Sequence, residues 1–244
     1  MPALPSDNPN LSQEYWQDLE TQPTHRRKAW LGGDWYAGAE GVVYDEFGDD
    51  NITREPFNPA LPYELAFDDG YIDPRVILFI QRTGTHIHVF DELYETKTLD
   101  ATGVRHTLER IMEMYSLTMP DDWVTMSLAD ASTWLVEHGA ALPEIAIGGT
   151  ESVKLMRQFR EANISARGGT HSIVEGVNHM RSLVRDGRGY RSLQVSPKCS
   201  NLIREMMQGY QYPTNSTRRD NELPEDKDNH AVDALRYWCW LRGK

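Results

Sequence analysis

The sequence predicts an α/β fold in which a mixed β-sheet is flanked by helices. Apolar and polar residues alternate over residues 63–68, as in a strand with one face buried more deeply than the other. Residues 76–80 form a continuous apolar run, which is typical of a strand buried on both faces. Further along the chain, short apolar runs alternate with stretches of helical spacing. This alternation indicates strand and helix units that share one sheet.

The first half of this pattern predicts three strands, a helix and a fourth strand. The runs 76–80 and 85–91 flank the turn Arg82-Thr83-Gly84 and therefore form a hairpin. Apolar residues at helical spacing then mark a helix through Val104, Leu108, Ile111 and Tyr115. Residues 124–128 alternate again, so we expect a strand that ends at Asp130 and a helix that starts near Ser132.

The second half continues with shorter units. We expect a strand at 145–147, a basic amphipathic helix at 151–162, a helix at 173–184, a strand at 193–195 and a helix after Pro197. A polar loop over 213–228 precedes the final helix, with Asp228 placed to cap its N-terminus. This order of elements describes an RNase H-like mixed sheet, and it begins at about residue 61.

The bulk composition is that of a globular protein. The chain has 244 residues, 39% hydrophobic and 25% charged, so it can bury one sizeable core. No apolar run approaches the roughly 18 to 20 residues needed to cross a bilayer, and the first residues do not resemble a signal peptide. Cys199 and Cys239 have no metal-binding spacing and suggest a reducing compartment.

The net charge of −12 argues, taken alone, against binding to nucleic acid. The distribution softens this objection, because residues 154–204 hold ten Lys or Arg against three acids. Bound cations would also cancel part of an acidic cluster. We therefore expect weak intrinsic affinity for DNA.

Three aspartates carry the functional prediction: Asp68, Asp130 and Asp233. Each lies where an apolar run ends or where a helix begins, and long stretches of chain separate them. Carboxylates gathered in this way suit hard divalent cations such as Mg²⁺ or Mn²⁺. Two such ions can activate a water and stabilise the leaving oxygen of a phosphodiester, with Asp68 bridging the two, Asp130 holding one and Asp233 the other. The pattern predicts a metal-dependent nuclease.

Other residues are candidates for supporting roles. Asp228 is either a plain N-cap or a further metal ligand, and His230 and Asp69 are expected to support the ligands rather than bind metal themselves. A second set follows turns or glycines and either contacts DNA phosphates or forms a solvated basic face: Arg188, Arg191 and Lys198.

The chain resembles the C-terminal nuclease domain of the large terminase subunit of tailed bacteriophages. The motifs that carry the resemblance are Asp68-Asp69-Gly70, Tyr71-Ile72-Asp73-Pro74, Ala129-Asp130-Ala131-Ser132, Val195-Ser196-Pro197-Lys198-Cys199 and Asn229-His230-Ala231-Val232-Asp233-Ala234-Leu235-Arg236-Tyr237. They cover residues 61–244. The resemblance implies an enzyme that cuts concatemeric viral DNA, in the host cell cytoplasm, together with a terminase ATPase domain, a small terminase subunit and a portal protein.

Residues 1–60 are similar to the terminase linker, which follows the ATPase core, and we expect them to form a small appendage. No Gly-x-x-x-x-Gly-Lys-(Ser/Thr) phosphate loop occurs, so we expect no ATP site in this chain. Two alternatives stay open. The chain is a portal-docking or ATPase-docking module whose nuclease acts only in the assembled motor, or it is another RNase H-like nuclease such as a junction resolvase.

Overall fold

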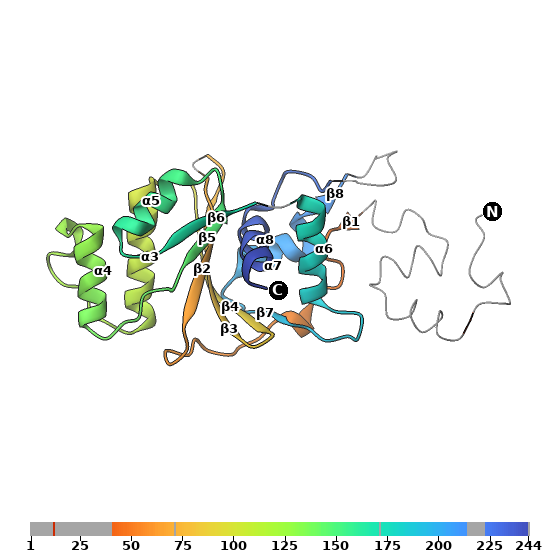
Figure 1. Cartoon of the computed structure of the whole chain (residues 1–244), viewed down its shortest axis with the longest axis horizontal. Coiled ribbons are helices and arrows are strands. Elements are labelled where there is room, and N and C mark those ends of the chain that lie inside the picture. The colour runs from red at the N-terminus through yellow and green to blue at the C-terminus, as the bar shows by residue number, and fades with distance from the viewer. Residues whose placement is uncertain (1–11, 13–40, 71, 171, 214–222, 244) are drawn as a thin grey trace.

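The structure is a computed structural model of the chain, and it describes residues 12, 41–70, 72–170, 172–213 and 223–243 (Figure 1). Most of the predicted linker over residues 1–60 therefore lies outside the described residues.

A six-stranded mixed sheet forms the centre of the molecule. Its strand order is β6-β5-β2-β3-β4-β7. The three middle strands are antiparallel neighbours, whereas β5, β6 and β7 join the sheet in parallel pairs. The strands span Tyr63–Asp68 (β2), Arg75–Thr83 (β3), His86–Glu95 (β4), Ala146–Gly149 (β5), Ala166–Gly169 (β6) and Leu193–Val195 (β7).

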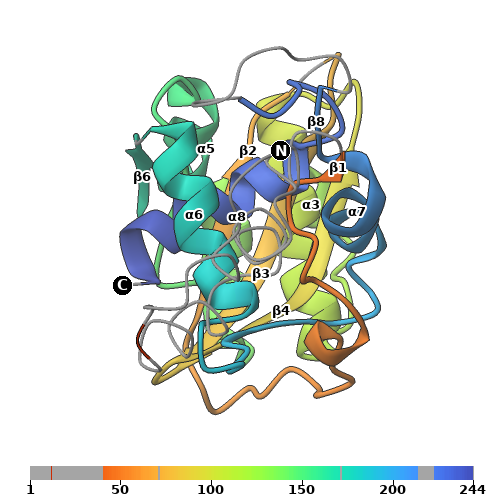
Figure 2. The ribbon, with the colours of Figure 1, turned by 90° about the vertical axis from the view of Figure 1, so that its right-hand side faces the viewer.

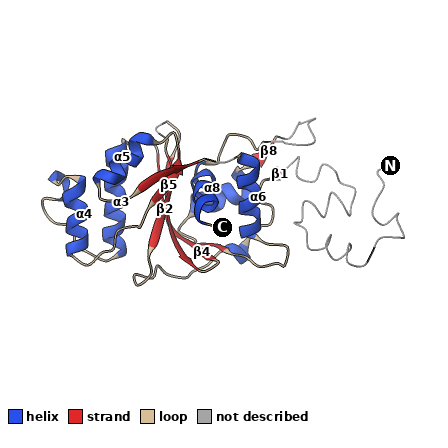
Figure 3. Cartoon of the chain, viewed as in Figure 1, coloured by secondary structure: helices blue, strands red, loops and turns tan. Residues whose placement is uncertain are grey.

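Helices cover both faces of this sheet (Figures 1 and 3). One layer contains α3, α4 and α5, and the other contains α6 and α8, with α7 beside it (Figure 2). The helices span Asp100–Met114 (α3), Leu128–Glu137 (α4), Val153–Glu161 (α5), Ile173–Val184 (α6), Ser200–Arg204 (α7) and His230–Arg242 (α8). Short turns of helix occur at Asp49–Asn51 and Trp123–Thr125, and a π-helical turn occurs at Glu205–Gly209.

The sheet divides the core into two clusters, and the side chains of strand β2 point into both. Leu65 and Phe67 pack in the cluster under α3, α4 and α5, whereas Ala66 packs in the cluster under α6 and α8. Since side chains alternate along a strand, Asp68 points toward the α8 layer. Glu64 confirms this direction, because its carboxylate accepts a hydrogen bond from Trp238 Nε1 in α8 at 2.7 Å.

Part of the segment before residue 60 packs into the same domain. Strand β1 (Gly41–Val42) pairs with β8 (Gln211–Tyr212), and Val43, Tyr44 and Phe47 are buried in the cluster that contains α8. Ile52 continues along the edge of the sheet by bridging to Val195. Residues from 41 onward therefore contribute to the core, and the existence of a separate appendage before them stays a prediction.

The sheet and most of its elements agree with the sequence analysis. The predicted mixed α/β sheet and the β3–β4 hairpin are confirmed. The predicted strand over 124–128 is wrong, because these residues form a helical turn followed by the start of α4. Strand β6 was not predicted; its sequence, Ala-Arg-Gly-Gly, carries no apolar run. Among the described helices, none is both long and apolar enough to cross a membrane.

Candidate functional site

Asp68 lies at the C-terminal end of β2 and contacts the first residue of α8. His230 Nδ1 is 3.1 Å from Asp68 Oδ2, and because a carboxylate only accepts, the ring nitrogen donates. This hydrogen bond raises the pKa of His230 from its ordinary value, against a smaller opposing effect of burial. Both side chains keep some exposure, about one fifth of each. A strand end and a helix start are thus joined by one polar contact that solvent can reach.

Asp233 lies one helical turn further along α8. Its carboxylate pairs with Arg236 of the same helix, with Oδ1 2.8 Å from Nη2. Burial raises the pKa of Asp233 to about 6, although the arginine pulls it down and the charge of Asp68 adds to the rise. The partner is an arginine three residues further along the same helix.

A third carboxylate, Glu151, reaches the same end of the sheet and was missed by the sequence analysis. Strand β5 ends at Gly149, and a β-carbon there would collide with the Glu151 carboxylate, so Glu151 fills the space over this glycine. In the parallel pairing Phe67 is matched with Gly148, so the next residues, Asp68 and Gly149, lie side by side at the strand ends. The Glu151 carboxylate therefore lies next to Asp68.

Tyr237 in α8 contacts Glu151 and lies within electrostatic reach of the other two carboxylates. Its hydroxyl lies 3.5 Å from Glu151 Oε1. Burial raises the pKa of this hydroxyl to about 12, and the negative charges of Glu151, Asp233 and Asp68 contribute to the rise. The charges of acids at the end of β2, in the turn after β5 and in α8 thus all act on this one hydroxyl.

A signal for Glu151 was present in the sequence. The run Ala146-Ile147-Gly148-Gly149 ends a buried strand, and an acid follows two residues later. Adjacent parallel strands bring their carboxyl ends to the same edge of a sheet, so this acid belongs near Asp68 whenever β5 pairs with β2. The sequence alone did not fix that pairing.

Asp130 does not join this group. It lies in the first turn of α4, where its backbone N–H donates to Ser127 Oγ at 3.1 Å and its carboxylate accepts from the same hydroxyl at 2.7 Å. Helix α4 belongs to the layer on the opposite face of the sheet from α8. The prediction that Asp130 ends a strand is wrong, because residues 124–128 form a helical turn and the first residue of α4. Asp130 is hydrogen-bonded to Ser127, the N-cap residue of that helix.

Two further predicted residues face other partners. Asp228 adopts a left-handed backbone with φ of 48° and pairs with Arg204 at 3.1 Å. The prediction that Asp228 caps the N-terminus of α8 is wrong, because Asn229 occupies the N-cap position. Asp69 turns to the buried Arg75, with Oδ1 2.8 Å from Nη2, and so braces the loop after β2.

The predicted DNA-contacting residues lie away from the carboxylates. Arg188 and Arg191 are in the loop before β7, whose first residue pairs with Ile87 near the start of β4, at the opposite end of the sheet from Asp68. Arg188 is exposed, whereas Arg191 donates to Asn51 Oδ1 at 2.7 Å and to the backbone oxygen of Glu46. Arg191 thus holds the fold together rather than facing solvent.

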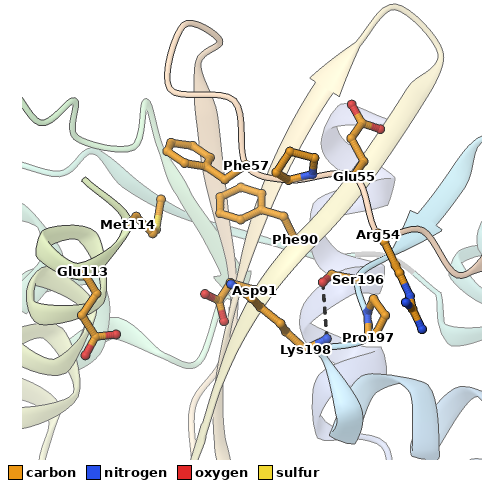
Figure 4. A pocket seen from close by; sticks show the side chains of 11 residues that line it. Arg54, Glu55, Phe57, Phe90, Asp91, Glu113, Met114, Ser196, Pro197 and Lys198 are labelled. Carbon is orange, nitrogen blue, oxygen red and sulfur yellow. Dashed lines mark hydrogen bonds between the residues drawn. The ribbon is translucent and has the colours of Figure 1, made fainter. Parts of the chain in front are cut away.

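Lys198 lies beside a separate cavity. With Phe57, Phe90 and Asp91 it lines a cavity of about 620 Å³ at the β4–β7 edge of the sheet. Figure 4 shows these side chains. Phe57 and Phe90 contact each other there, with ring centroids 4.9 Å apart. None of Asp68, Glu151 and Asp233 lines this cavity, so it is distinct from the carboxylate site.

The donor chemistry of the carboxylate site suits a hard cation. Asp68, Glu151 and Asp233 offer only oxygen ligands, which Mg²⁺ and Mn²⁺ prefer. Within the described part of the chain, however, no three Asp, Glu, His or Cys side chains are already grouped as a metal would hold them. Each of the three carboxylates instead faces a protein group: His230, Tyr237 or Arg236. Binding a cation there requires at least Asp233 to exchange its arginine.

No family model matches the sequence, and no curated protein matches it. Solved structures do match the fold. A large terminase from a thermophilic bacteriophage aligns with a TM-score of 0.64 and 15% identity, over 96% of this chain and 53% of that one. The nuclease domain of the P22 large terminase aligns with a TM-score of 0.54 and 14% identity, over 84% and 93% of the two chains.

A third structure, the g2p large terminase nuclease domain from bacteriophage SPP1 with bound Mn, gives a TM-score of 0.50 and 16% identity, over 80% of this chain and 98% of that one. The chain therefore has the RNase H-like fold of phage terminase nuclease domains. It spans about half the length of the large terminase from the thermophilic bacteriophage.

Proposed function

We propose that this chain is a metal-dependent endonuclease that cuts concatemeric double-stranded viral DNA during genome packaging. The observation that carries the proposal is that Asp68, Glu151 and Asp233 lie at one end of the sheet, at the end of β2, in the turn after β5 and in α8. The fold supports it, because the neighbours include terminase nuclease domains, one of them with bound Mn.

The proposed ligands are Asp68 at the centre, with Glu151 on one side and Asp233 on the other. A pair of Mg²⁺ or Mn²⁺ ions held there would supply an activated water and charge neutralisation at the leaving 3′ oxygen. His230 orients the Asp68 carboxylate through its Nδ1 hydrogen bond. Glu151 takes the role that the sequence analysis gave to Asp130.

The wider partners are also proposals. Exposed Arg188 and Lys198 remain candidates for contacts with phosphates far from the cut site. By its fold, the chain would work in the host cell cytoplasm with a terminase ATPase domain, a small terminase subunit and a portal protein.

A second candidate is a module whose nuclease becomes active only in the assembled motor. The ion pair between Asp233 and Arg236 favours it, because this pair occupies a proposed metal ligand in the isolated chain. A partner that offered Arg236 another acidic group would release that carboxylate.

The test is conversion of supercoiled plasmid to nicked and linear forms by the full chain with Mn²⁺, Mg²⁺ or EDTA. We expect cutting that needs metal, is lost in Asp68→Ala and survives in Asp130→Ala, which removes an exposed aspartate on the other face of the sheet. Absence of cutting by the folded wild-type chain with either metal would favour the motor-dependent candidate. Cutting that Asp68→Ala does not affect would refute the proposed site.

A further inference from the structure

The start of α8 is held by a side chain from another element. Glu205, in the π-helical turn after α7, is fully buried, and its Oε2 accepts the backbone N–H groups of Ala231 at 2.8 Å and Val232 at 3.1 Å. The first N–H groups of a helix have no partner inside it and need an acceptor. Glu205 therefore caps α8 from a distance of 26 residues along the chain.

The helix's own cap residue is used differently. Asn229 occupies the N-cap position, but its side chain accepts no hydrogen bond from the backbone N–H groups of the helix. Its Nδ2 donates instead to Asp226 Oδ1 at 3.1 Å and lies 3.5 Å from Asp233 Oδ2, so it faces the carboxylate site. Glu205 caps α8 because the side chain of Asn229 points toward the carboxylate site instead.

Glu205 is itself fixed on its other side. Its Oε1 accepts a hydrogen bond from the hydroxyl of Tyr94, at the end of β4, at 2.9 Å. The backbone oxygen of Glu205 accepts from Tyr210 N at 2.9 Å, which closes the π-helical turn. Such turns are rare and are found mainly at functional sites. One buried carboxylate thus links β4, the π-helical turn and α8.

We propose that Glu205 is a positioning residue for the metal site. The two amides that Glu205 binds lie between His230, which contacts Asp68, and Asp233, a proposed ligand. By holding this first turn of α8 in place, Glu205 positions the side chains of His230 and Asp233 relative to the end of β2. This inference rests on the proposed function, because it assumes that Asp68 and Asp233 bind metal. The role is separate from metal binding, since both oxygens of Glu205 are already taken by protein groups.

The test is Mn²⁺ binding by the full chain, measured as loss of the free-ion electron paramagnetic resonance signal. Glu205→Ala removes the cap, whereas Glu205→Gln keeps a carbonyl that can accept both amides and an NH₂ that can donate to the Tyr94 oxygen. The matched control is Gln81→Ala. Gln81 is also buried and hydrogen-bonded to backbone, at Asn58 and Leu61, but it pairs with Tyr63 at the other end of the sheet.

We expect Glu205→Ala to weaken Mn²⁺ binding by about tenfold or more, Glu205→Gln to restore it to within about threefold, and Gln81→Ala to leave it unchanged although it also lowers stability. If Glu205→Ala does not fold, Tyr94→Phe, which removes only the hydroxyl on Oε1, should weaken binding severalfold. Unchanged affinity in the folded capping variant would overturn the positioning role. If the wild-type chain binds no Mn²⁺, the proposed function fails first, and this inference fails with it.

Discussion

His230 Nδ1 lies 3.1 Å from Asp68 Oδ2, so the first residue of α8 is hydrogen-bonded to the last residue of β2 across 162 positions of sequence. This contact fixes how the final helix meets the strand end. It also has a consequence for stability that depends on pH.

The hydrogen bond to Asp68 raises the pKa of His230 in the folded chain above its ordinary value. A raised folded pKa means that the stabilisation is complete below the unfolded pKa of about 6.5 and is lost as pH rises through the folded value. In EDTA, the melting temperature of the wild type should exceed that of His230→Gln by more at about pH 6 than at about pH 9. Thermal melts followed by circular dichroism measure this. An equal difference at both pH values would show that the ion pair does not form.

Gly149 leaves room for the Glu151 carboxylate, because a β-carbon there would collide with it. Gly149→Ala should push that carboxylate away from Asp68. Since the collision is with the end of a flexible side chain, we expect a loss of stability of only about 1 kcal/mol but a reduction of metal-dependent cleavage by about tenfold or more.

Gly48→Ala is the matched control for this change, because nothing lies within 4 Å of a β-carbon at Gly48. Plasmid cleavage and urea unfolding of both variants make the comparison. Full cleavage activity in Gly149→Ala would remove Glu151 from the proposed site.

Arg75 holds the loop that follows Asp68. Its guanidinium is 3% exposed and binds the carboxylates of Asp69 and Asp100 and the backbone oxygen of Thr98. Arg75→Met would leave two partly buried carboxylates without their cation, so we expect a loss of about 3 kcal/mol in the free energy of unfolding.

Urea unfolding at neutral pH measures this loss. Arg157→Met is the control, because Arg157 forms an exposed pair with Glu161 and its loss should change stability by about 0.5 kcal/mol or less. Equal effects of the two substitutions would mean that the Arg75 contacts do not stabilise the loop.

The sequence predicts most of the sheet because its strands have clear patterns. The alternation in β2 and the apolar run in β3 follow the burial of their side chains, because buried strand positions favour apolar residues. The short edge strand β6 escaped prediction because Ala166, Arg167, Gly168 and Gly169 have no strand pattern of their own, and pairing with β5 makes them a strand.

The candidate site was predicted in part. Asp68 and Asp233 could be found because each lies in a local pattern, a strand end and an apolar helix. Asp130 was misplaced because alternating residues before a capped helix look like a strand. Glu151 and Glu205 could not be placed from sequence, since their roles depend on contacts with elements that are distant along the chain: β2 for Glu151 and α8 for Glu205.

The most direct test of the central claim compares Glu151→Gln with Asp130→Asn, each of which removes one negative charge at nearly constant size. Both are assayed for plasmid cleavage with Mn²⁺ and for Mn²⁺ binding, beside the wild type and after circular dichroism has shown that they fold. We predict that Glu151→Gln loses cleavage and binds Mn²⁺ at least about tenfold more weakly, while Asp130→Asn behaves as the wild type. Loss of cleavage in Asp130→Asn with retention in Glu151→Gln would contradict the site proposed at the ends of β2 and β5.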